Sequence, residues 1–155
     1  MKLTAFTDYA LRVLIYLAAQ PQRRATIAEI AAVFDVKENH LTKVAHFLGR
    51  NGLLHNVRGN GGGLELAREP QAIVVGQVVR LTEGAAMPAQ CFGDAPGACR
   101  IARQCRLRDA LGRAVDAFYA VLDDCTLEDL VHEQPALGVL LRPGRPVARI
   151  HVPLP

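Results

Sequence analysis

Three of the four cysteines in this chain lie within fifteen residues, at Cys91, Cys99 and Cys105, with the spacing Cys-x7-Cys-x5-Cys. The first gap contains two glycines and a proline, a composition that predicts an irregular loop. Helical periodicity begins at about Ile101, which places Cys105 in or near the first turn of a helix. Three thiols that converge through a loop onto the start of a helix can form a metal or iron–sulfur site that lacks one ligand.

The surroundings of these cysteines favour the thiolate, which is the form that binds metal. A helix N-terminus and nearby positive charge both stabilise a thiolate. Four arginines supply the charge: Arg100, Arg103, Arg106 and Arg108. Each of them is equally compatible with an ordinary solvated helix face. The spacing lacks a Cys-x2-Cys knuckle and fits structural zinc poorly; it fits an iron–sulfur cluster with one non-cysteine ligand better, without settling the choice.

A reactive cysteine in an enzyme is a further alternative for this stretch. Such a cysteine needs a neighbouring base, but the cysteine loop contains no histidine, and the nearest one downstream is His132. We therefore expect that the protein is not an enzyme. The fourth cysteine, Cys125, lies on the apolar stripe of a later helix and is expected to be a small core residue.

The distribution of charge and of apolar residues favours a nucleic-acid-binding protein over a membrane or secreted one. Residues 1–66 contain eight Lys or Arg and five Asp or Glu, a balance of +3, whereas residues 67–155 contain ten of each. This weak excess of positive charge in the N-terminal part is typical of a nucleic-acid-binding module. The sequence contains no apolar run long enough to cross a membrane, and its first residues lack the order of a secretory signal. We therefore expect a cytoplasmic protein with reduced thiols.

The first of the elements that must position the cysteines is a helix over about residues 4–19, mostly apolar and predicted to be buried on most sides. Asp8 and Arg12 stand four residues apart on its polar stripe. From the residues alone, Asp8 is an acid of the first turn that complements the helix dipole and pairs with Arg12.

Two short helices are predicted next. Thr26 and Glu29 have the spacing of a capping box, which opens a helix that ends at about residue 35. A second helix over about residues 37–51 is stopped by Gly52. This is the helix-turn-helix pattern, although two helices of an ordinary small bundle would give the same pattern. The residues of the second helix expected to contact DNA are Lys37, Asn39, His40 and Lys43.

A glycine-rich hairpin follows directly, with strands at about residues 53–57 and 64–66, and it favours a winged helix over a bundle. Its tip glycines allow a close approach to a phosphate chain or minor groove, and one arginine at its base suits a narrow groove. A nucleotide-cradling loop fits less well, because neither a Lys-Ser/Thr pair nor a helix start follows the glycines. The expected DNA contacts of the wing are Arg58, Gly59, Asn60 and Gly61.

The remaining chain predicts a short helix over residues 73–82 and then a long one of about 25 residues, on the order of 37 Å. Its apolar stripe is longer than a domain of this size covers, which indicates a two-fold dimer. Residues 126–131 cap and start one more helix. We thus predict a mainly α protein: a winged helix-turn-helix domain over residues 1–83, a cluster-binding loop over 84–105, a dimerisation helix with a short C-terminal helix over 106–134, and a disordered tail over 135–155.

Four motifs of this sequence occur together. They are Phe6-Thr7-Asp8-Tyr9-Ala10-Leu11-Arg12, the wing Arg58-Gly59-Asn60-Gly61-Gly62-Gly63, the three clustered cysteines, and Thr126-Leu127-Glu128-Asp129-Leu130-Val131. In this combination, residues 1–134 resemble the NsrR/IscR family of bacterial winged-helix transcriptional regulators. They are most similar to its nitric-oxide-sensing NsrR branch.

The resemblance implies a homodimer with one 4Fe–4S cluster per subunit, held by Cys91, Cys99, Cys105 and, as the fourth ligand, Asp8 of the partner subunit. The IscR branch carries a 2Fe–2S cluster and has a histidine three residues after the last cysteine, where this chain has Arg108. The NsrR branch implies a repressor of a palindromic DNA operator, released when nitric oxide nitrosylates or removes the cluster. The alternative is a regulator of the same fold that senses iron–sulfur status or redox state.

Overall fold

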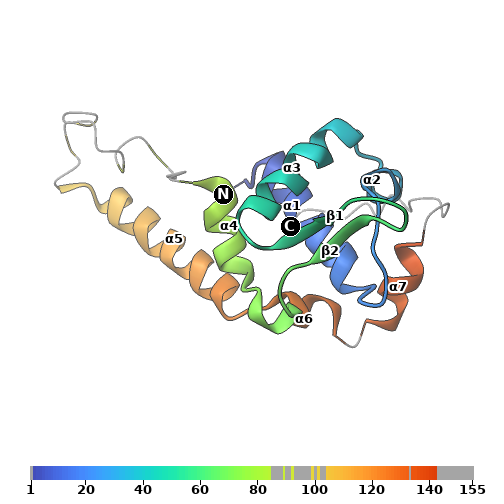
Figure 1. Cartoon of the computed structure of the whole chain (residues 1–155). Coiled ribbons are helices and arrows are strands. Elements are labelled where there is room, and N and C mark those ends of the chain that lie inside the picture. Colours follow the sequence, from blue (N-terminus) through green and yellow to red (C-terminus); the bar gives the residue numbers. More distant parts are fainter. Residues whose placement is uncertain are drawn as a thin grey trace.

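The computed structural model describes residues 2–84, 89, 92, 99, 101, 104–132 and 134–142. This part of the chain is mainly helical with one two-stranded sheet, as the sequence predicted (Figure 1). In chain order the elements are α1 (Ala5–Ala18), α2 (Ile27–Phe34), α3 (Glu38–Arg50), β1 (Leu54–Val57), β2 (Gly63–Leu66), the 3-10 helix η1 (Pro70–Ala72), α4 (Val75–Glu83), α5 (Arg106–Asp123), α6 (Leu127–Val131) and α7 (Pro135–Leu140). None of these helices is long and apolar enough to span a membrane.

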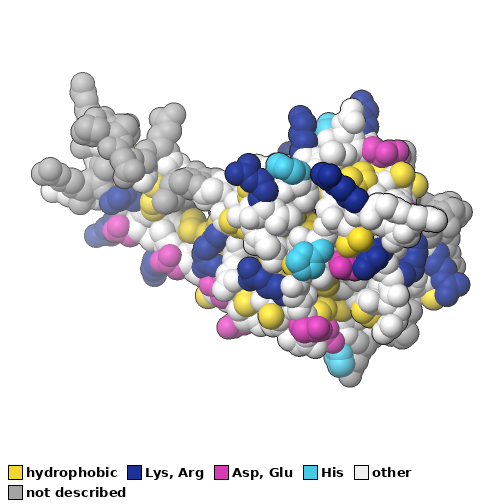
Figure 2. Space-filling model, in the orientation of Figure 1, with side chains coloured by type: hydrophobic (Ala, Val, Ile, Leu, Met, Phe, Trp, Pro, Cys, Tyr) yellow, Lys and Arg dark blue, Asp and Glu magenta, His cyan; other side chains and the backbone are white. Residues whose placement is uncertain are grey.

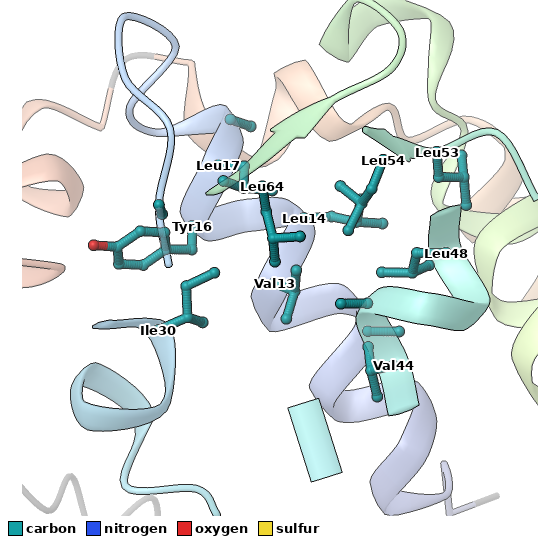
Figure 3. Packing of buried hydrophobic residues seen from close by; sticks show 14 of the residues in the cluster. Val13, Leu14, Tyr16, Leu17, Ile30, Val44, Leu48, Leu53, Leu54 and Leu64 are labelled. Carbon is teal, nitrogen blue, oxygen red and sulfur yellow. The ribbon is translucent and has the colours of Figure 1, made fainter. Parts of the chain in front are cut away.

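Helix α1 lies at the centre of the core, where its apolar side chains meet α2, α3 and the hairpin (Figure 3). The buried side chains labelled there are Val13, Leu14, Tyr16, Leu17, Ile30, Val44, Leu48, Leu53, Leu54 and Leu64. Burial of large apolar side chains is the main favourable contribution to folding, at roughly 1.5–3 kcal/mol each. Because α1 supplies so many of these side chains, a movement of α1 must also displace the helices packed on it.

Helices α2 and α3 form the predicted helix-turn-helix. Thr26 caps α2 by accepting a hydrogen bond from the backbone N–H of Glu29, at 3.1 Å. The Glu29 side chain does not complete the predicted capping box, because it accepts hydrogen bonds from the Tyr16 hydroxyl and the Arg23 guanidinium instead. Helix α2 ends at Phe34 and is followed by Asp35, whose φ of 51° lies in the left-handed region and reverses the chain toward α3.

The hairpin after α3 forms the wing. Strands β1 and β2 are antiparallel, with Leu54 opposite Leu66. Ala25 adds one further rung on the other edge of β2, through backbone hydrogen bonds of 2.8 and 3.1 Å with Leu64. The base of the wing is therefore joined to the segment that leads into α2, so wing and helix-turn-helix form one unit.

Helix α5 runs from the body of the molecule at its C-terminal end to a projecting N-terminal end (Figure 1). It has 18 residues, fewer than the 25 predicted, because the helix begins only after Cys105, whose backbone is extended. Arg80 of α4 donates two hydrogen bonds, of 2.5 and 2.7 Å, to the Asp123 carboxylate, and its guanidinium lies 4.2 Å from the centroid of the Tyr119 ring. A Cβ at Gly76 would meet Asp123 Oδ1 at 2.1 Å, so this close crossing of α4 and α5 requires glycine.

The C-terminal part differs from the prediction. Helix α6 begins with a complete capping box between Thr126 and Asp129. The prediction of a disordered tail is wrong for residues 135–142, because α7 begins at Pro135 and the side chain of Leu141 is buried in the core. A proline in the first turn of a helix loses no hydrogen bond, so it starts this helix rather than preventing it. Residues 143–155 lie outside the described residues, and for them the prediction stays a prediction.

Candidate DNA-binding surface and cluster site

All eight residues predicted to contact DNA are exposed. They are Lys37, Asn39, His40, Lys43, Arg58, Gly59, Asn60 and Gly61. The first four lie at the start and on the outer face of α3, because the apolar face of this helix is turned into the core. The other four lie at the wing. These are the two elements that a winged helix presents to DNA, although contact by the individual residues stays a prediction.

The wing tip is built from backbone rather than bulky side chains. Gly59 and Gly61 have φ of 98° and 77°, in the left-handed region that glycine adopts without strain. A Cβ at Gly62 would lie 2.4 Å from the carbonyl oxygen of Val57. The tip is therefore thin, and a groove or a phosphate chain can approach its backbone closely, with Arg58 at its base.

Two basic residues of α3 were missed by the sequence analysis. His46 and Arg50 are exposed and, with Lys43 and Phe6, line an open groove beside α1. They follow Lys43 by three and seven residues, so all three residues lie on one helical stripe. This spacing is the feature of the sequence that could have identified them. Figure 2 shows Lys, Arg and His side chains along α3, where a negatively charged phosphate chain would be attracted.

Asp8 is accessible on the first turn of α1. Its carboxylate accepts hydrogen bonds from the guanidinium of Arg12, at 3.0 and 2.9 Å, as the four-residue spacing predicted. The two side chains are 45% and 41% exposed, respectively. An ion pair this exposed is weak, so Asp8 can exchange Arg12 for another partner at small cost.

The residue before Asp8 is held firmly. The Thr7 side chain is fully buried, and its hydroxyl donates a hydrogen bond to the Glu83 carboxylate at the end of α4. The same carboxylate oxygen accepts from the N–H and the hydroxyl of Thr4, at 2.8 and 3.0 Å. Burial raises the pKa of Glu83, but these hydrogen bonds outweigh it and leave the pKa below its ordinary value. Glu83, the last residue of α4 before the cysteine loop, thus binds the first turn of α1.

Two of the three predicted cysteine ligands can be placed. Cys99 and Cys105 are half-buried free thiols, and Cys105 stands directly before the first residue of α5. Cys91 lies outside the described residues. Cys125 lies at the other end of α5, where its thiol donates to the carbonyl of Thr126 at 3.6 Å and burial raises its pKa. The thiolate is thereby disfavoured at Cys125, although its side chain is half-buried outside the core cluster rather than the core residue that the sequence predicted.

The predicted donor set of three thiols and one carboxylate can be compared with the chemistry of an iron–sulfur site. Within the described residues, a group of three or more side chains that could hold a metal ion does not occur. The predicted set draws on Cys91 and on a second subunit, so this part of one chain cannot complete it. The free, half-buried thiols of Cys99 and, at the start of α5, of Cys105 do fit thiolate ligation of iron, whereas an all-oxygen metal site would need carboxylates there.

Arg108 stands in the first turn of α5, where the resemblance to the IscR branch would imply a histidine ligand. Its guanidinium lies 5.4 Å from the centroid of the Phe92 ring, in the cysteine loop. A guanidinium remains protonated in proteins and has no lone pair to offer a metal. Arg108 therefore holds an aromatic side chain of the loop against α5 rather than binding iron.

The fold and the surface together define a winged-helix DNA-binding transcriptional regulator. The family model named Rrf2, described as an iron-dependent transcriptional regulator, matches residues 3–133. The chain belongs to this family. As predicted, it is a regulator rather than an enzyme, and its resemblance to the NsrR/IscR group is confirmed.

Several named relatives cover nearly the whole chain. The HTH-type transcriptional regulator NsrR of Geobacillus kaustophilus is 43% identical over 146 residues, which span 94% of this chain and 99% of the relative. NsrR of Bacillus subtilis is 43% identical over 143 residues, 92% of this chain and 98% of the relative. Among solved structures, the global cysteine regulator CymR of B. subtilis matches with a TM-score of 0.69 and 31% identity over 84% of this chain and 96% of CymR. T. potens IscR matches with a TM-score of 0.68 and 26% identity over 84% and 86% of the two chains.

Proposed function

We propose that the protein is a homodimeric repressor that senses nitric oxide through one 4Fe–4S cluster per subunit and releases its operator when the cluster is nitrosylated or lost. One observation carries the proposal: the chain has a free thiol, Cys105, at the projecting end of α5, a second at Cys99 in the preceding loop, and an accessible, weakly paired acid on α1. The similarity to relatives named NsrR supports nitric oxide as the signal.

The residues that would hold the cluster are Cys91, Cys99 and Cys105 of one subunit and the partner subunit's Asp8. Thiolates suit iron in such a site, whereas a carboxylate is a harder, more weakly held ligand. Asp8 is therefore the ligand that an incoming molecule displaces most easily. Its own subunit offers Arg12 as an alternative partner, 2.9 Å away.

The dimer would form through α5. None of the 18 residues of this helix is buried within the chain, and Leu107 and Val121 are 66% and 70% exposed. The stripe is half-buried at Leu111, Val115, Phe118 and Leu122, and an apolar stripe that its own chain covers only in part favours a partner. A second copy of α5, related by a two-fold axis, would be such a partner, because the same apolar surface would then face itself.

In this dimer, Asp8 joins the α1 helix of one subunit to the cysteine loop of the other. Because α3 packs on α1, that link sets the separation of the two α3 helices, which must enter successive major grooves of a palindromic operator. When bound, the cluster would supply iron that can react with nitric oxide. Release of Asp8 lets the two α3 helices shift. An almost complete change from bound to free requires about 5 kcal/mol of differential affinity.

A regulator that senses iron–sulfur status or redox state is the second candidate. The description of the family as iron-dependent favours it, because iron supply alone would then decide whether the Asp8 link forms. The fold and the proposed ligands are the same in both cases. Only the signal that removes the link differs.

The test is operator binding by anaerobically purified protein during titration with nitric oxide or with oxygen. We expect a brown protein that binds the operator and loses it at a few equivalents of nitric oxide, whereas the same amount of oxygen leaves binding intact. Cys105→Ala should prevent cluster binding, and Cys125→Ala, its matched control, should not. A colourless preparation with full operator affinity contradicts the proposal, and equal sensitivity to oxygen and nitric oxide favours the second candidate.

A further inference from the structure

Tyr9 connects the first helix to the predicted DNA-reading helix. Its ring stacks on the imidazole of His40, with ring centroids 6.0 Å apart and planes inclined by 22°. His40 is exposed and lies in the first turn of α3, the part of a recognition helix that meets base edges. Tyr9 directly follows Asp8 in the chain. One side chain therefore spans the distance between the proposed sensing contact and the proposed DNA contact.

The turn that carries Asp8 and Tyr9 is fixed on two other sides. Phe6 packs edge-on against Phe47 of α3, with centroids 5.2 Å apart and planes at 85°. Thr7 is bound to α4 through the partly buried hydrogen bond to Glu83 described above. Successive residues of a helix point about 100° apart, so these four side chains leave the turn in different directions. With two of them locked in packed surroundings, a pull on Asp8 is transmitted to Tyr9 rather than absorbed by the turn.

We propose that the Tyr9–His40 stack is the relay through which the state of Asp8 sets the position of His40 on DNA. The inference rests on the proposed function, because it takes Asp8 to be a ligand of the partner's cluster. With Asp8 paired with Arg12, the Tyr9 ring stacks on the imidazole and confines it to one side-chain rotamer. With Asp8 bound at the partner's cluster, the ring shifts and His40 samples other rotamers on DNA, as an exposed side chain does. Tyr9 is thus a positioning residue, and its ring rather than its hydroxyl performs the role.

The size of the effect follows from the stack. An aromatic pair of this kind changes an equilibrium constant by about 2- to 12-fold, in addition to the effect of the area that it buries. A dimer places two such pairs on one operator. Loss of the ring should therefore reduce the ratio between operator affinities of cluster-loaded and cluster-free protein by about 5- to 150-fold.

The experiment compares this ratio in the wild type, Tyr9→Phe and Tyr9→Leu full-length proteins. Tyr9→Phe keeps the ring and should keep the ratio within about twofold. Tyr9→Leu should bring the ratio toward one, while its iron content and visible absorption spectrum stay those of the wild type. A purely structural role of Tyr9 would lower both affinities together and leave the ratio unchanged. A Tyr9→Leu protein that retains the wild-type ratio overturns the relay.

Failure of the relay and failure of the proposed function give different results. If the wild type itself binds the operator equally well with and without the cluster, the proposed function is wrong. If the wild type shows a large ratio and Tyr9→Leu retains it, only the relay is wrong. The imidazole proton resonances of His40 supply a reading that needs no variant: their chemical shifts in the wild type should differ between the loaded and cluster-free states, and equal shifts overturn the relay.

Discussion

Replacing Glu83 with alanine removes the contact that holds the first turn of α1 to α4. The Glu83 carboxylate accepts three hydrogen bonds, from the N–H and hydroxyl of Thr4 at 2.8 and 3.0 Å and from the hydroxyl of Thr7. Without it, the only hydrogen-bonding partner left to the buried Thr7 hydroxyl among the described residues is the side-chain oxygen of Thr4, at 3.1 Å. The substitution therefore leaves a buried polar group poorly satisfied, which costs more than the loss of an exposed hydrogen bond.

The expected loss can be estimated from these contacts. A hydrogen bond to a charged group contributes about 1.5–3 kcal/mol, and those at the exposed Thr4 contribute less. We expect Glu83→Ala to lower the free energy of unfolding by about 2–4 kcal/mol, from a total of about 5–15 kcal/mol for a domain of this kind. Exposed Glu69, whose side chain makes no hydrogen bond to the described residues, is the matched control, and Glu69→Ala should change stability by less than about 0.5 kcal/mol.

The same contact predicts a dependence on pH. The pKa of Glu83 is lowered in the folded protein, because the hydrogen bonds outweigh the effect of burial. The unfolded chain, with a glutamate pKa of about 4.3, then takes up a proton more readily than the folded one. The stabilisation is therefore present above about pH 4.3 and is lost as pH falls through the folded pKa. Glu83→Gln should remove this part of the acid sensitivity.

Urea unfolding of cluster-free protein, followed by circular dichroism, measures both effects. Protein concentration must be held fixed, because a dimer's apparent stability depends on it. Thr7→Val completes a double-mutant cycle, and a coupling energy near zero between Thr7 and Glu83 would refute the reasoning. So would a Glu83→Ala protein as stable as the Glu69→Ala control.

Three further predictions follow from separate parts of the molecule. Asp8→Ala should keep the fold, measured by circular dichroism, but give a cluster that is lost to a chelator faster than in the wild type; an unchanged rate and spectrum would place the fourth ligand elsewhere. Arg58→Ala should weaken operator binding and reduce the slope of log affinity against log salt by about one, measured by fluorescence anisotropy, and an unchanged slope would remove Arg58 from the DNA contacts. Gly76→Ala should lower the free energy of unfolding by about 1–3 kcal/mol, because its Cβ would meet Asp123 Oδ1 at 2.1 Å, whereas Gly138→Ala, with its nearest neighbour at 3.7 Å, should be close to neutral in the same urea titration.

The fold was largely predictable because its signals are local. Hydrophobic periodicity located α1 to α4, and the glycine-rich tip located the wing. The exposure of the predicted DNA-binding residues follows from the same periodicity, since burying Leu41, Val44, Ala45 and Leu48 turns the opposite face of α3 outward. The extent of α5 and the existence of α7 were mispredicted, because both depend on what the backbone does at single residues, Cys105 and Pro135.

The contacts around Asp8 could not be predicted in this way. Glu83 and Thr7 are 76 residues apart, and Tyr9 and His40 belong to different helices, so no periodic pattern joins them. The same limit applies to Glu29, whose spacing from Thr26 indicated a capping box although its carboxylate binds Tyr16. In each case the partner is determined by tertiary packing, which a residue pattern within one helix does not predict.

The central claim is that iron bound between two subunits governs operator affinity. The most direct test is to count iron and inorganic sulfide per chain in anaerobic protein while operator affinity is measured on the same samples through stepwise loss of the cluster. We predict about four iron and four sulfide atoms per chain in the DNA-binding form and an affinity that falls in parallel with them. Full affinity in samples that contain no iron would contradict the account.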